Sequence, residues 1–528
     1  MKNLLITAAV FLGMCFIYVL IMLSETENNF TYILDDAYIH LALAKNFALH
    51  GVWGVTEYVY SSSSSSPLFT FLLSGLIYVF GNHQLIPLLF NFGCVLLTVY
   101  FLNKYYSNLF KGNTGVILAS LFTLLFASVH LLVFSGMEHV LQVLVIVINI
   151  YCFEKWRASG FKNSSYSGCF YGTLALLGLI RFESMFYFLA LSFVFLWLGK
   201  WKQSTILLLF GFIPIGVFGY FTHQETGYYF PNSVIVKGTK LDFSGNYLVQ
   251  IKNIFLNKLV LKPYFHLTAL PPLCFVALLL FKDYTNKLSF REIVLRNFLL
   301  IVFGITLFVQ AAFGQFTNFY RYEAYLLTAF AMLVITRIKN VFAGGSIVLK
   351  QNKTTVLLIV CTFMILVLKM VLISILIITG SRNIYEQQIQ SARFLKQYYN
   401  NSKLIANDIG AVCYFTDIHL LDIAGLGSKE AVPFKVKKHG MNDEFEKFLT
   451  AYTAQNHFQL AIVYEGWLEG HVPENWRKAA VLEIQGGNAV LGLKQVTIYS
   501  VDPDIHHSLQ QNVKNFHWNK NVVVRIIK

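Results

Sequence analysis

Two adjacent carboxylates open the most polar stretch in the first part of the chain. Asp35 and Asp36 follow a long apolar segment, and Tyr38 and His40 come next. A carboxylate can take a proton from a hydroxyl group, so either Asp could act as a general base. Asp35, Asp36 and Glu138 could instead hold a divalent cation, which prefers oxygen ligands. Each Asp also has a structural interpretation, because Asp is favoured at the start of a helix.

Further polar motifs lie at short breaks between apolar segments: Ser135–His139, Arg181–Glu183, Gly227–Asn232 with Lys237, and Arg321–Glu323. Ionisable residues at membrane depth are costly and usually functional. Arg is the usual partner of a phosphate group, and cations stabilise a departing anion. We therefore predict binding of a phosphate and a sugar by Arg181, Lys237, Arg321, Tyr38, His40, Glu138, Glu183, Asn232 and Tyr322.

These motifs also have structural interpretations. Arg181 and Glu183 could form a structural ion pair, Glu138 could end a helix at the membrane interface, and Arg321 could be a stop-transfer residue. The run Ser61–Ser66 is predicted to be a flexible loop rather than a hydroxyl cluster with a role.

The composition identifies the elements that carry these residues. Of the 528 residues, 56% are hydrophobic and 13% are charged, whereas soluble domains have about a quarter charged residues. The chain is therefore predicted to be a polytopic protein of the lipid bilayer. The apolar run 4–23 is long enough to span the membrane and is predicted to be an uncleaved first helix. The net charge of +14 lies largely in short loops, so it indicates topology and not nucleic-acid binding.

Apolar segments recur along the first 380 residues, and the loops between them alternate in charge. The segments are 4–23, 67–80, 84–102, 115–134, 138–153, 168–180, 184–199, 203–222, 265–281, 297–313, 322–337 and 355–378. Loops rich in Lys and Arg are predicted to be cytoplasmic. The alternation requires residues 67–102 to cross once, as a bent pair, which gives about 11 crossings with a cytoplasmic N-terminus. All the polar motifs, the first outer loop 24–66 and the C-terminal region then share the outer face.

Residues 381–528 are richer in charge and have short β-type runs. The predicted strands are Lys403–Ile405, Ala411–Phe415, Leu460–Tyr464, Val481–Ile484, Val496–Ser500 and Val522–Ile527. Helices are predicted over Tyr385–Tyr399 and Asn442–Gln455. This pattern is typical of a small α/β domain. We expect domains at 1–380 and 381–528, the second being extracytoplasmic.

The order of these motifs resembles that in GT-C superfamily glycosyltransferases. The signature includes Asp35-Asp36-Ala37-Tyr38-Ile39-His40, Gly51-Val52-Trp53-Gly54 and Ser64-Ser65-Ser66-Pro67, with matches at Asp408-Ile409-Gly410-Ala411 and Leu421–Leu426. It is most similar to bacterial arabinofuranosyltransferases that use decaprenyl-phosphate arabinose. The resemblance implies a site at the outer leaflet, an acidic residue of the first outer loop as base, and a polyprenyl-phosphate donor. Asp36 is slightly preferred over Asp35 as the base.

The sequence thus predicts a GT-C type α-helical polytopic membrane domain with a C-terminal α/β extracytoplasmic domain, in a bacterial inner membrane. The expected activity is sugar transfer, with arabinofuranose first, from a polyprenyl-phosphate sugar to an envelope polysaccharide or pilin-like protein. Mannose and aminoarabinose are alternative sugars. A lipid-linked-sugar transporter and a non-catalytic envelope assembly factor are alternatives of another class, and a divalent cation is left open.

Overall fold

The computed structural model describes residues 2–238, 246–314, 316, 319–343, 352–437 and 441–527. Up to residue 313 its elements are α1 (Lys2–Glu25), α2 (Asp36–His50), α3 (Pro67–Phe80), α4 (Ile86–Ser107), α5 (Asn113–Phe126), α6 (Val129–Ser135), α7 (His139–Ala158), α8 (Ser164–Ile180), α9 (Ser184–Trp197), α10 (Trp201–Thr226), α11 (Asn232–Lys237), α12 (Tyr247–Ile254), the π-helical turn η1 (Phe255–Val260), α13 (Pro263–Thr285), α14 (Phe290–Arg296) and α15 (Phe298–Phe313).

The later helical elements are α16 (Ala324–Ala343), α18 (Lys353–Ile384), the π-helical turn η2 (Tyr385–Ile389), α19 (Gln390–Tyr398), α20 (Gly410–Phe415), α21 (Val432–Lys437), α22 (Asp443–Gln455), η3 (Glu465–Leu468), η4 (Pro503–Ile505) and α23 (His506–Asn515). The strands are β1 (Lys403–Ala406), β2 (His419–Asp422), β3 (Leu460–Val463), β4 (Arg477–Ile484), β5 (Gln495–Ser500) and β6 (Val522–Ile526).

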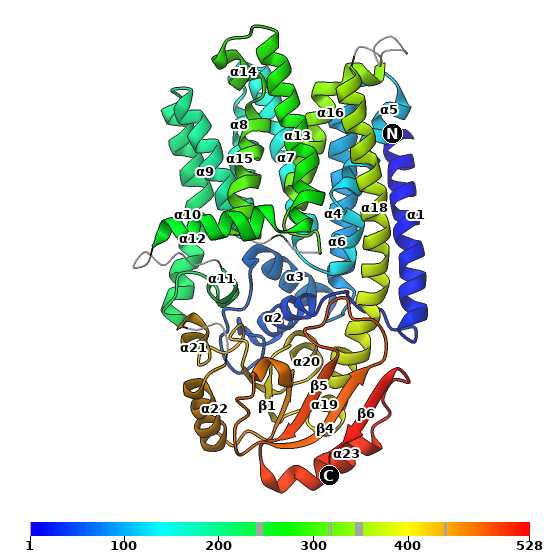
Figure 1. Ribbon diagram of the computed structural model, residues 1–528, viewed down its shortest axis with the longest axis vertical. Helices are drawn as coiled ribbons and strands as arrows, with labels where there is room; N and C mark the ends of the chain where they lie inside the picture. The colour runs from blue at the N-terminus through cyan, green and yellow to red at the C-terminus, as the bar shows by residue number, and fades with distance from the viewer. Residues whose placement is uncertain are drawn as a thin grey trace.

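Long helices form a bundle at one end of the molecule, and the strands with their covering helices form the other end (Figure 1). Helices α2 and α3 lie across the molecule between these two parts (Figure 1). The bundle presents large apolar side chains outward, such as Leu5 and Phe16 of α1, each 61% exposed. Because helices that are apolar all round are typical of membrane spans, the protein is a multi-pass membrane protein.

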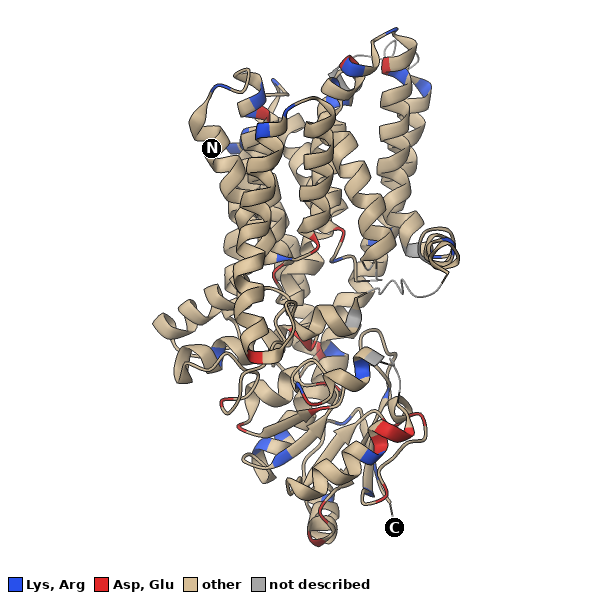
Figure 2. Ribbon diagram, turned by 90° about the vertical axis from the view of Figure 1, so that its left-hand side faces the viewer, with Lys and Arg blue, Asp and Glu red and all other residues tan. Residues whose placement is uncertain are grey.

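Six described helices are long and apolar enough to cross a membrane, or eight if the bent pairs α5–α6 and α14–α15 each count as one span. The predicted number of about 11 crossings includes shorter helices, such as α9, and stays a prediction. In residues 67–102, α3 lies across the molecule and α4 runs along the bundle (Figure 1), and of the two α4 is long enough to be a candidate span; the single crossing stays a prediction. Within the bundle, Lys and Arg gather at the end farthest from the strands (Figure 2), as the topology prediction requires.

One continuous helix joins the two parts. The helix that begins as α18 runs through η2 and α19 over Lys353–Tyr398. The boundary proposed between 380 and 381 therefore lies inside a helix and not in a linker. Next to this boundary, Ser381 donates a hydrogen bond to the carbonyl of Thr31 at 3.0 Å. The helix is therefore also bonded to the first loop, 24–66.

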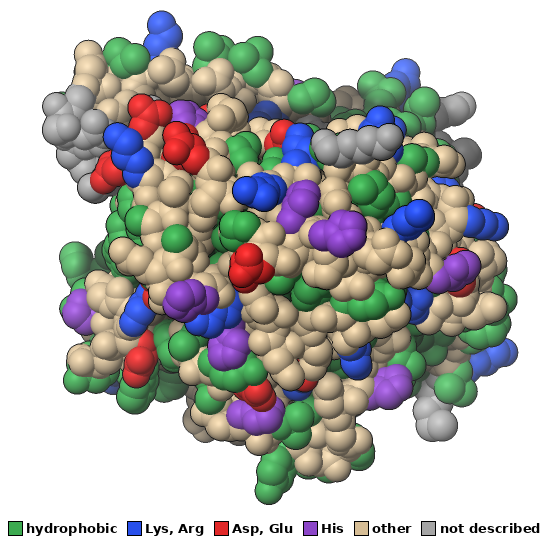
Figure 3. Space-filling view, turned by 90° about the horizontal axis from the view of Figure 1, so that it is seen from below, with side chains coloured by type: hydrophobic (Ala, Val, Ile, Leu, Met, Phe, Trp, Pro, Cys, Tyr) green, Lys and Arg blue, Asp and Glu red, His purple; other side chains and the backbone are tan. Residues whose placement is uncertain are grey.

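The strands form one mixed six-stranded sheet in the order β2-β1-β3-β5-β4-β6. Strand β1 pairs parallel with β2 and β3, and the remaining pairs are antiparallel. Side chains alternate between the faces of a strand: Leu404 and Ala406 of β1 join the main core, while Ile405 packs in a second core with Phe445 of α22. Seen from this end, the surface mixes acidic, basic, histidine and apolar side chains (Figure 3).

Two local predictions in this domain were wrong. The segment Ala411–Phe415 belongs to helix α20 and not to a strand, and strand β2 at His419–Asp422 was missed. The other predicted strands and both predicted helices lie within about two residues of observed elements, apart from β4, which begins at Arg477.

Candidate active site

Asp36 faces a cavity between the bundle and the sheet domain. Its carboxylate Oδ2 accepts a hydrogen bond from Nη1 of Arg321 at 2.9 Å. The cavity has a volume of about 170 Å³ and is lined by residues of α2, the serine run, α9 and α11, together with Tyr322 and Leu426. Asp36 starts α2, where a carboxylate is stabilised by the helix dipole. Its side chain is 29% exposed, so a ligand can reach it.

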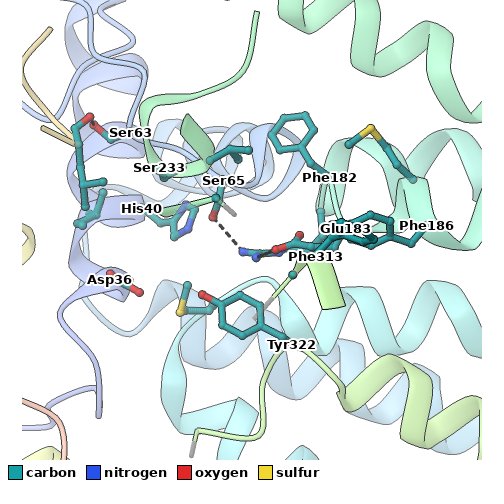
Figure 4. A pocket seen from close by; sticks show the side chains of 18 residues that line it. Asp36, His40, Ser63, Ser65, Phe182, Glu183, Phe186, Ser233, Phe313 and Tyr322 are labelled. Atoms are coloured by element: carbon teal, nitrogen blue, oxygen red, sulfur yellow. Dashed lines mark hydrogen bonds and ion pairs between the residues drawn. The ribbon is translucent and has the colours of Figure 1, made fainter. Parts of the chain in front are cut away.

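Arg181 is the centre of the polar end of the cavity. Its guanidinium group donates to Glu138 at 2.6 Å, to both carboxylate oxygens of Glu183 at 2.5 and 3.0 Å, and to Ser65 at 3.0 Å. Figure 4 shows the bond from Arg181 to Ser65 as a dashed line. The Glu138 side chain is fully buried, whereas that of Glu183 is 26% exposed. A ligand could therefore replace Glu183, but not the buried Glu138, as a partner of Arg181.

His40 connects this arginine cluster to Thr70 of α3, which in turn bonds to Ser64 of the serine run. Its Nε2 lies 3.3 Å from Oε2 of Glu138, and its Nδ1 lies 2.9 Å from the hydroxyl of Thr70. Glu138 is fully buried, and its carboxylate lies 2.6 Å from Arg181 and 3.3 Å from His40. It therefore fixes Arg181 and His40 in place.

Tyr322 contacts both arginines of the site. The guanidinium carbons of Arg181 and Arg321 lie 5.0 and 4.9 Å from the centre of its ring. Both distances suit cation–π interactions, which stabilise a cation at an aromatic face. Arg321 also donates to the Tyr322 hydroxyl at 3.2 Å. This ring keeps two positive charges within one small site.

The opposite end of the cavity is apolar. Phe182, Met185, Phe186 and Phe313 line it, and Figure 4 shows these phenylalanines on the side away from Asp36 and His40. They come from the start of α9, the turn before it and the end of α15. The cavity thus combines a charged end with a wall of aromatic and aliphatic side chains.

Asp35 faces away from the cavity and holds the sheet domain. Its two carboxylate oxygens accept hydrogen bonds from the backbone N–H groups of Gly410 at 2.6 Å and Ala411 at 2.8 Å, at the start of α20. Burial, with a smaller contribution from the nearby Asp408, raises the pKa of Asp35 to about 7, although these N–H groups lower it. The two adjacent carboxylates therefore have different surroundings.

We predict that Gly410→Ala separates α20 from the first loop. A Cβ at this position would lie 2.1 Å from the Asp35 carbonyl oxygen and 2.8 Å from its carboxylate. Overpacking of this kind destabilises by about 1–3 kcal/mol, so the unfolding temperature in detergent should fall. Gly487→Ala is the matched control, because a Cβ there has nothing within 4 Å. Equal unfolding temperatures for the two variants would contradict the prediction.

Two predicted ligand-binding residues, Tyr38 and Asn232, are placed elsewhere, and a third is not described. Tyr38 is fully buried, and its hydroxyl accepts from the backbone of Tyr32 at 3.3 Å. Asn232 donates to the carbonyl of Leu426 at 3.3 Å and braces the loop instead of lining the cavity. The side chain of Lys237 lies outside the described residues. The other six predicted residues lie at or next to the cavity. Four of them line it, namely Arg181, His40, Glu183 and Tyr322. Glu138 and Arg321 each form an ion pair with a lining residue.

The three carboxylates considered for a cation have separate partners. Asp35 binds backbone N–H groups, Asp36 binds Arg321, and Glu138 binds Arg181. Among the described residues, the group of three whose possible ligand atoms all lie within 4.8 Å of one another is Asp443, Glu446 and His471, in the sheet domain. The predicted trio does not fit a shared metal ion, and we assign no step to one.

The serine run differs from the flexible loop expected from the sequence. Ser61, Ser62, Ser63, Ser64 and Ser66 are each at most 5% exposed. Ser63 donates to the carbonyl of Leu426 at 2.9 Å, and Ser64 bonds to Thr70 at 2.9 Å. Ser63 and Ser65 line the cavity, so the run is part of its wall. In the sequence, the signal for this role was the Ser64–Pro67 motif, which overlaps the run and is part of the family resemblance.

Comparisons with known proteins address the fold. A family model described as a domain of unknown function, DUF8728, matches residues 382–499. No curated protein matches the sequence significantly. ArnT from Cupriavidus metallidurans, bound to undecaprenyl phosphate, aligns with a TM-score of 0.51 and 9% identity over 94% of this chain and 98% of that chain. The chain therefore has the same overall fold as ArnT.

Other solved structures are similar to this chain as well. ArnT from the same organism in the apo state gives a TM-score of 0.50 at 11% identity, over 94% of this chain and 98% of that chain. The archaeal oligosaccharyltransferase AglB from Archaeoglobus fulgidus, in complex with an inhibitory peptide and a dolichol-phosphate, gives 0.48 at 12% identity, over 97% and 75%. The ArnT alignments extend over nearly the whole of both chains, so the predicted architecture of a helical membrane domain followed by a C-terminal sheet region is shared with ArnT.

Proposed function

We propose that the protein is a membrane glycosyltransferase that moves a sugar from a polyprenyl-phosphate donor to an acceptor in the cell envelope. Arabinofuranose is the first candidate sugar, with mannose and aminoarabinose as alternatives. The acceptor is an envelope polysaccharide or a pilin-like protein. The site would lie at the outer face of a bacterial inner membrane.

One observation carries this proposal: a single cavity has Asp36 and Arg181 at its polar end, with Arg321 bound to Asp36, and an aromatic wall at the other end. A polyprenyl-phosphate sugar has the matching layout, with a polar head and a long apolar tail. The tail would lie along Phe186 and Phe313, and the phosphate would take the place of Glu183 at Arg181. The fold shared with ArnT, a structure bound to undecaprenyl phosphate, supports the same donor class.

The residues at the polar end can perform the transfer. Asp36 takes the proton of the acceptor hydroxyl, whose oxygen forms a bond to the anomeric carbon of the sugar. The bond from that carbon to the phosphate oxygen breaks, and the phosphate leaves with the electron pair. Arg181 and Arg321 stabilise the charge on the departing phosphate, because fixed cations act strongly in a site with little water.

The alternatives of another class are a lipid-linked-sugar transporter and a non-catalytic assembly factor. A transporter is expected to distribute polar sites around the bilayer midplane. Here the charged cluster lies next to the sheet domain, between the bundle and α20. This position favours chemistry on an acceptor outside the membrane.

The decisive experiment supplies membranes containing the protein with labelled polyprenyl-phosphate arabinofuranose, mannose or aminoarabinose, and an envelope extract as acceptor. We expect label from one donor to enter the extract and free polyprenyl phosphate to accumulate. Movement of intact donor across proteoliposomes without loss of its sugar would instead support the transporter. If no donor is consumed or moved, the proposal is wrong.

A further inference from the structure

A second cavity lies at the carboxyl ends of the three parallel strands. Asn407 follows β1, Ala424 lies just after β2, and Trp467 lies after β3. The cavity has a volume of about 170 Å³. In open sheets of this kind, ligands bind outside the carboxyl ends of the strands where the chain changes direction. Strand β1 is such a point, because β2 pairs on one side of it and β3 on the other.

Asn407 offers an unused hydrogen-bond donor to this cavity. The residue is 5% exposed, and its side-chain oxygen accepts from the backbone N–H of Tyr464 at 3.3 Å. Its amide nitrogen is buried and has no hydrogen-bond partner in the described part of the chain. Buried donors of this type are usually satisfied. The amide is therefore positioned to donate to an oxygen atom of a ligand.

Trp467 gives the cavity an aromatic wall. Trp467 as a residue is 43% exposed, and its indole ring packs against Tyr464, whose ring centre lies 5.0 Å away. It also lies against Gly492, where a Cβ would come within 2.5 Å of the indole. The absence of a side chain at Gly492 lets the indole lie in this position.

Two opposite charges complete the lining, Lys435 and Glu469. The Lys435 ammonium group lies 4.9 Å from the centre of the Phe445 ring, which holds it in place. A carboxylate beside this lysine disfavours an anionic ligand such as a phosphate. It suits a neutral ligand with hydroxyl groups, which can both accept from Lys435 and donate to Glu469.

We propose that this second cavity binds a saccharide unit of the acceptor, with its C–H face on Trp467 and its hydroxyl groups on Asn407, Lys435 and Glu469. The assignment of the saccharide to the acceptor rests on the proposed glycosyltransferase function. Binding of the saccharide itself does not.

A short turn connects this cavity to the candidate active site. The buried Asp422 carboxylate accepts from the backbone N–H groups of Ala424, Leu426 and Gly427, at 2.6–2.7 Å. Ala424 lines the second cavity, and Leu426 lines the cavity that contains Asp36. The turn therefore forms part of both walls, and it would hold a bound saccharide chain next to the transfer site.

The test measures saccharide binding to the full-length protein in detergent by saturation-transfer NMR and calorimetric titration, with α-1,5-arabinotriose and mannotriose as probes. We expect at least one trisaccharide to bind. Trp467→Ala and Glu469→Gln should each weaken that binding about tenfold or more, since an aromatic platform and a hydrogen bond are lost. Glu474→Gln, an exposed carboxylate in the same domain, is the matched control and should bind as the wild type does.

Three outcomes would overturn the inference: neither trisaccharide binds, Trp467→Ala and Glu469→Gln bind like the wild type, or Glu474→Gln is as weak as Glu469→Gln. Because Glu469 is exposed, its variant should fold normally. Asp36→Asn should keep trisaccharide binding while it loses transfer. Binding without any transfer by the wild type would therefore reject the proposed function and leave the saccharide site standing.

Discussion

We expect Asp36→Asn to lower sugar transfer by about 10²–10⁴-fold, the usual contribution of a general base. Asn has the same shape as Asp, so its side-chain oxygen can still accept the hydrogen bond that Arg321 donates to Asp36 at 2.9 Å in the wild type. It cannot, however, take a proton from the acceptor hydroxyl. Donor binding should persist, because Arg181 and the apolar wall remain. Transfer and photo-crosslinking of a labelled donor should be measured on the same membranes.

Asp35→Asn is the matched control for this variant. It changes the neighbouring carboxylate, which binds the N–H groups of Gly410 and Ala411 and not the cavity. Placing an amide NH₂ against one of these donors should lower stability by about 1–3 kcal/mol, with transfer per folded molecule within a few-fold of the wild type. Normal transfer by Asp36→Asn, or a greater loss by Asp35→Asn, would reverse the assignment.

We expect Arg181→Gln to abolish transfer and to destabilise the protein. The substitution leaves Glu138 buried without the arginine that now binds it at 2.6 Å. Breaking a buried ion pair on one side typically costs about 3–5 kcal/mol. Thermal unfolding in detergent should show this loss. Arg525→Gln, which removes an exposed ion pair with Glu483, should change stability by less than about 1 kcal/mol.

A double variant separates the structural and catalytic roles of Arg181. Adding Glu138→Gln to Arg181→Gln removes the uncompensated charge, so the unfolding temperature should largely recover. Transfer should stay absent, because the cation that stabilises the departing phosphate is still missing. Recovery of transfer in the double variant would show that Arg181 serves only to neutralise Glu138.

The convergence of the polar motifs was predictable from charge patterning. Lys and Arg predict which face each loop lies on, and on that prediction the unusual polar motifs fall on the same side. Arg321 and Asp36, 285 residues apart, do meet in the structure. Sequence reasoning works for this pair because charged groups at membrane depth need partners.

The separate roles of Asp35 and Asp36 could not be predicted. Successive residues at a helix start point about 100° apart, so one of the two must face away from the cavity. The direction is decided by α20, which supplies the two N–H groups that bind Asp35. The same contact explains the wrong strand at Ala411–Phe415, because that apolar run becomes a helix where Asp35 binds its first N–H groups.

The serine run was misjudged for a related reason. Small polar residues in a row are typical of flexible segments. In the folded protein their hydroxyl groups bind Leu426, Thr70 and Arg181, and none of these partners is adjacent in the sequence. The composition of the segment alone therefore could not predict that it is buried.

The bond between Asp35 and Gly410 also has a consequence for biosynthesis. The two residues are 375 positions apart, and at about 5–20 residues per second a ribosome needs roughly 20–75 s to reach the second after the first. On the proposed topology, the first loop is outside the membrane during that time, without the helix that buries the Asp35 carboxylate. Leu426 of the cavity wall also follows α20 in the chain, so the proposed transfer site is completed only when the sheet domain has been synthesised.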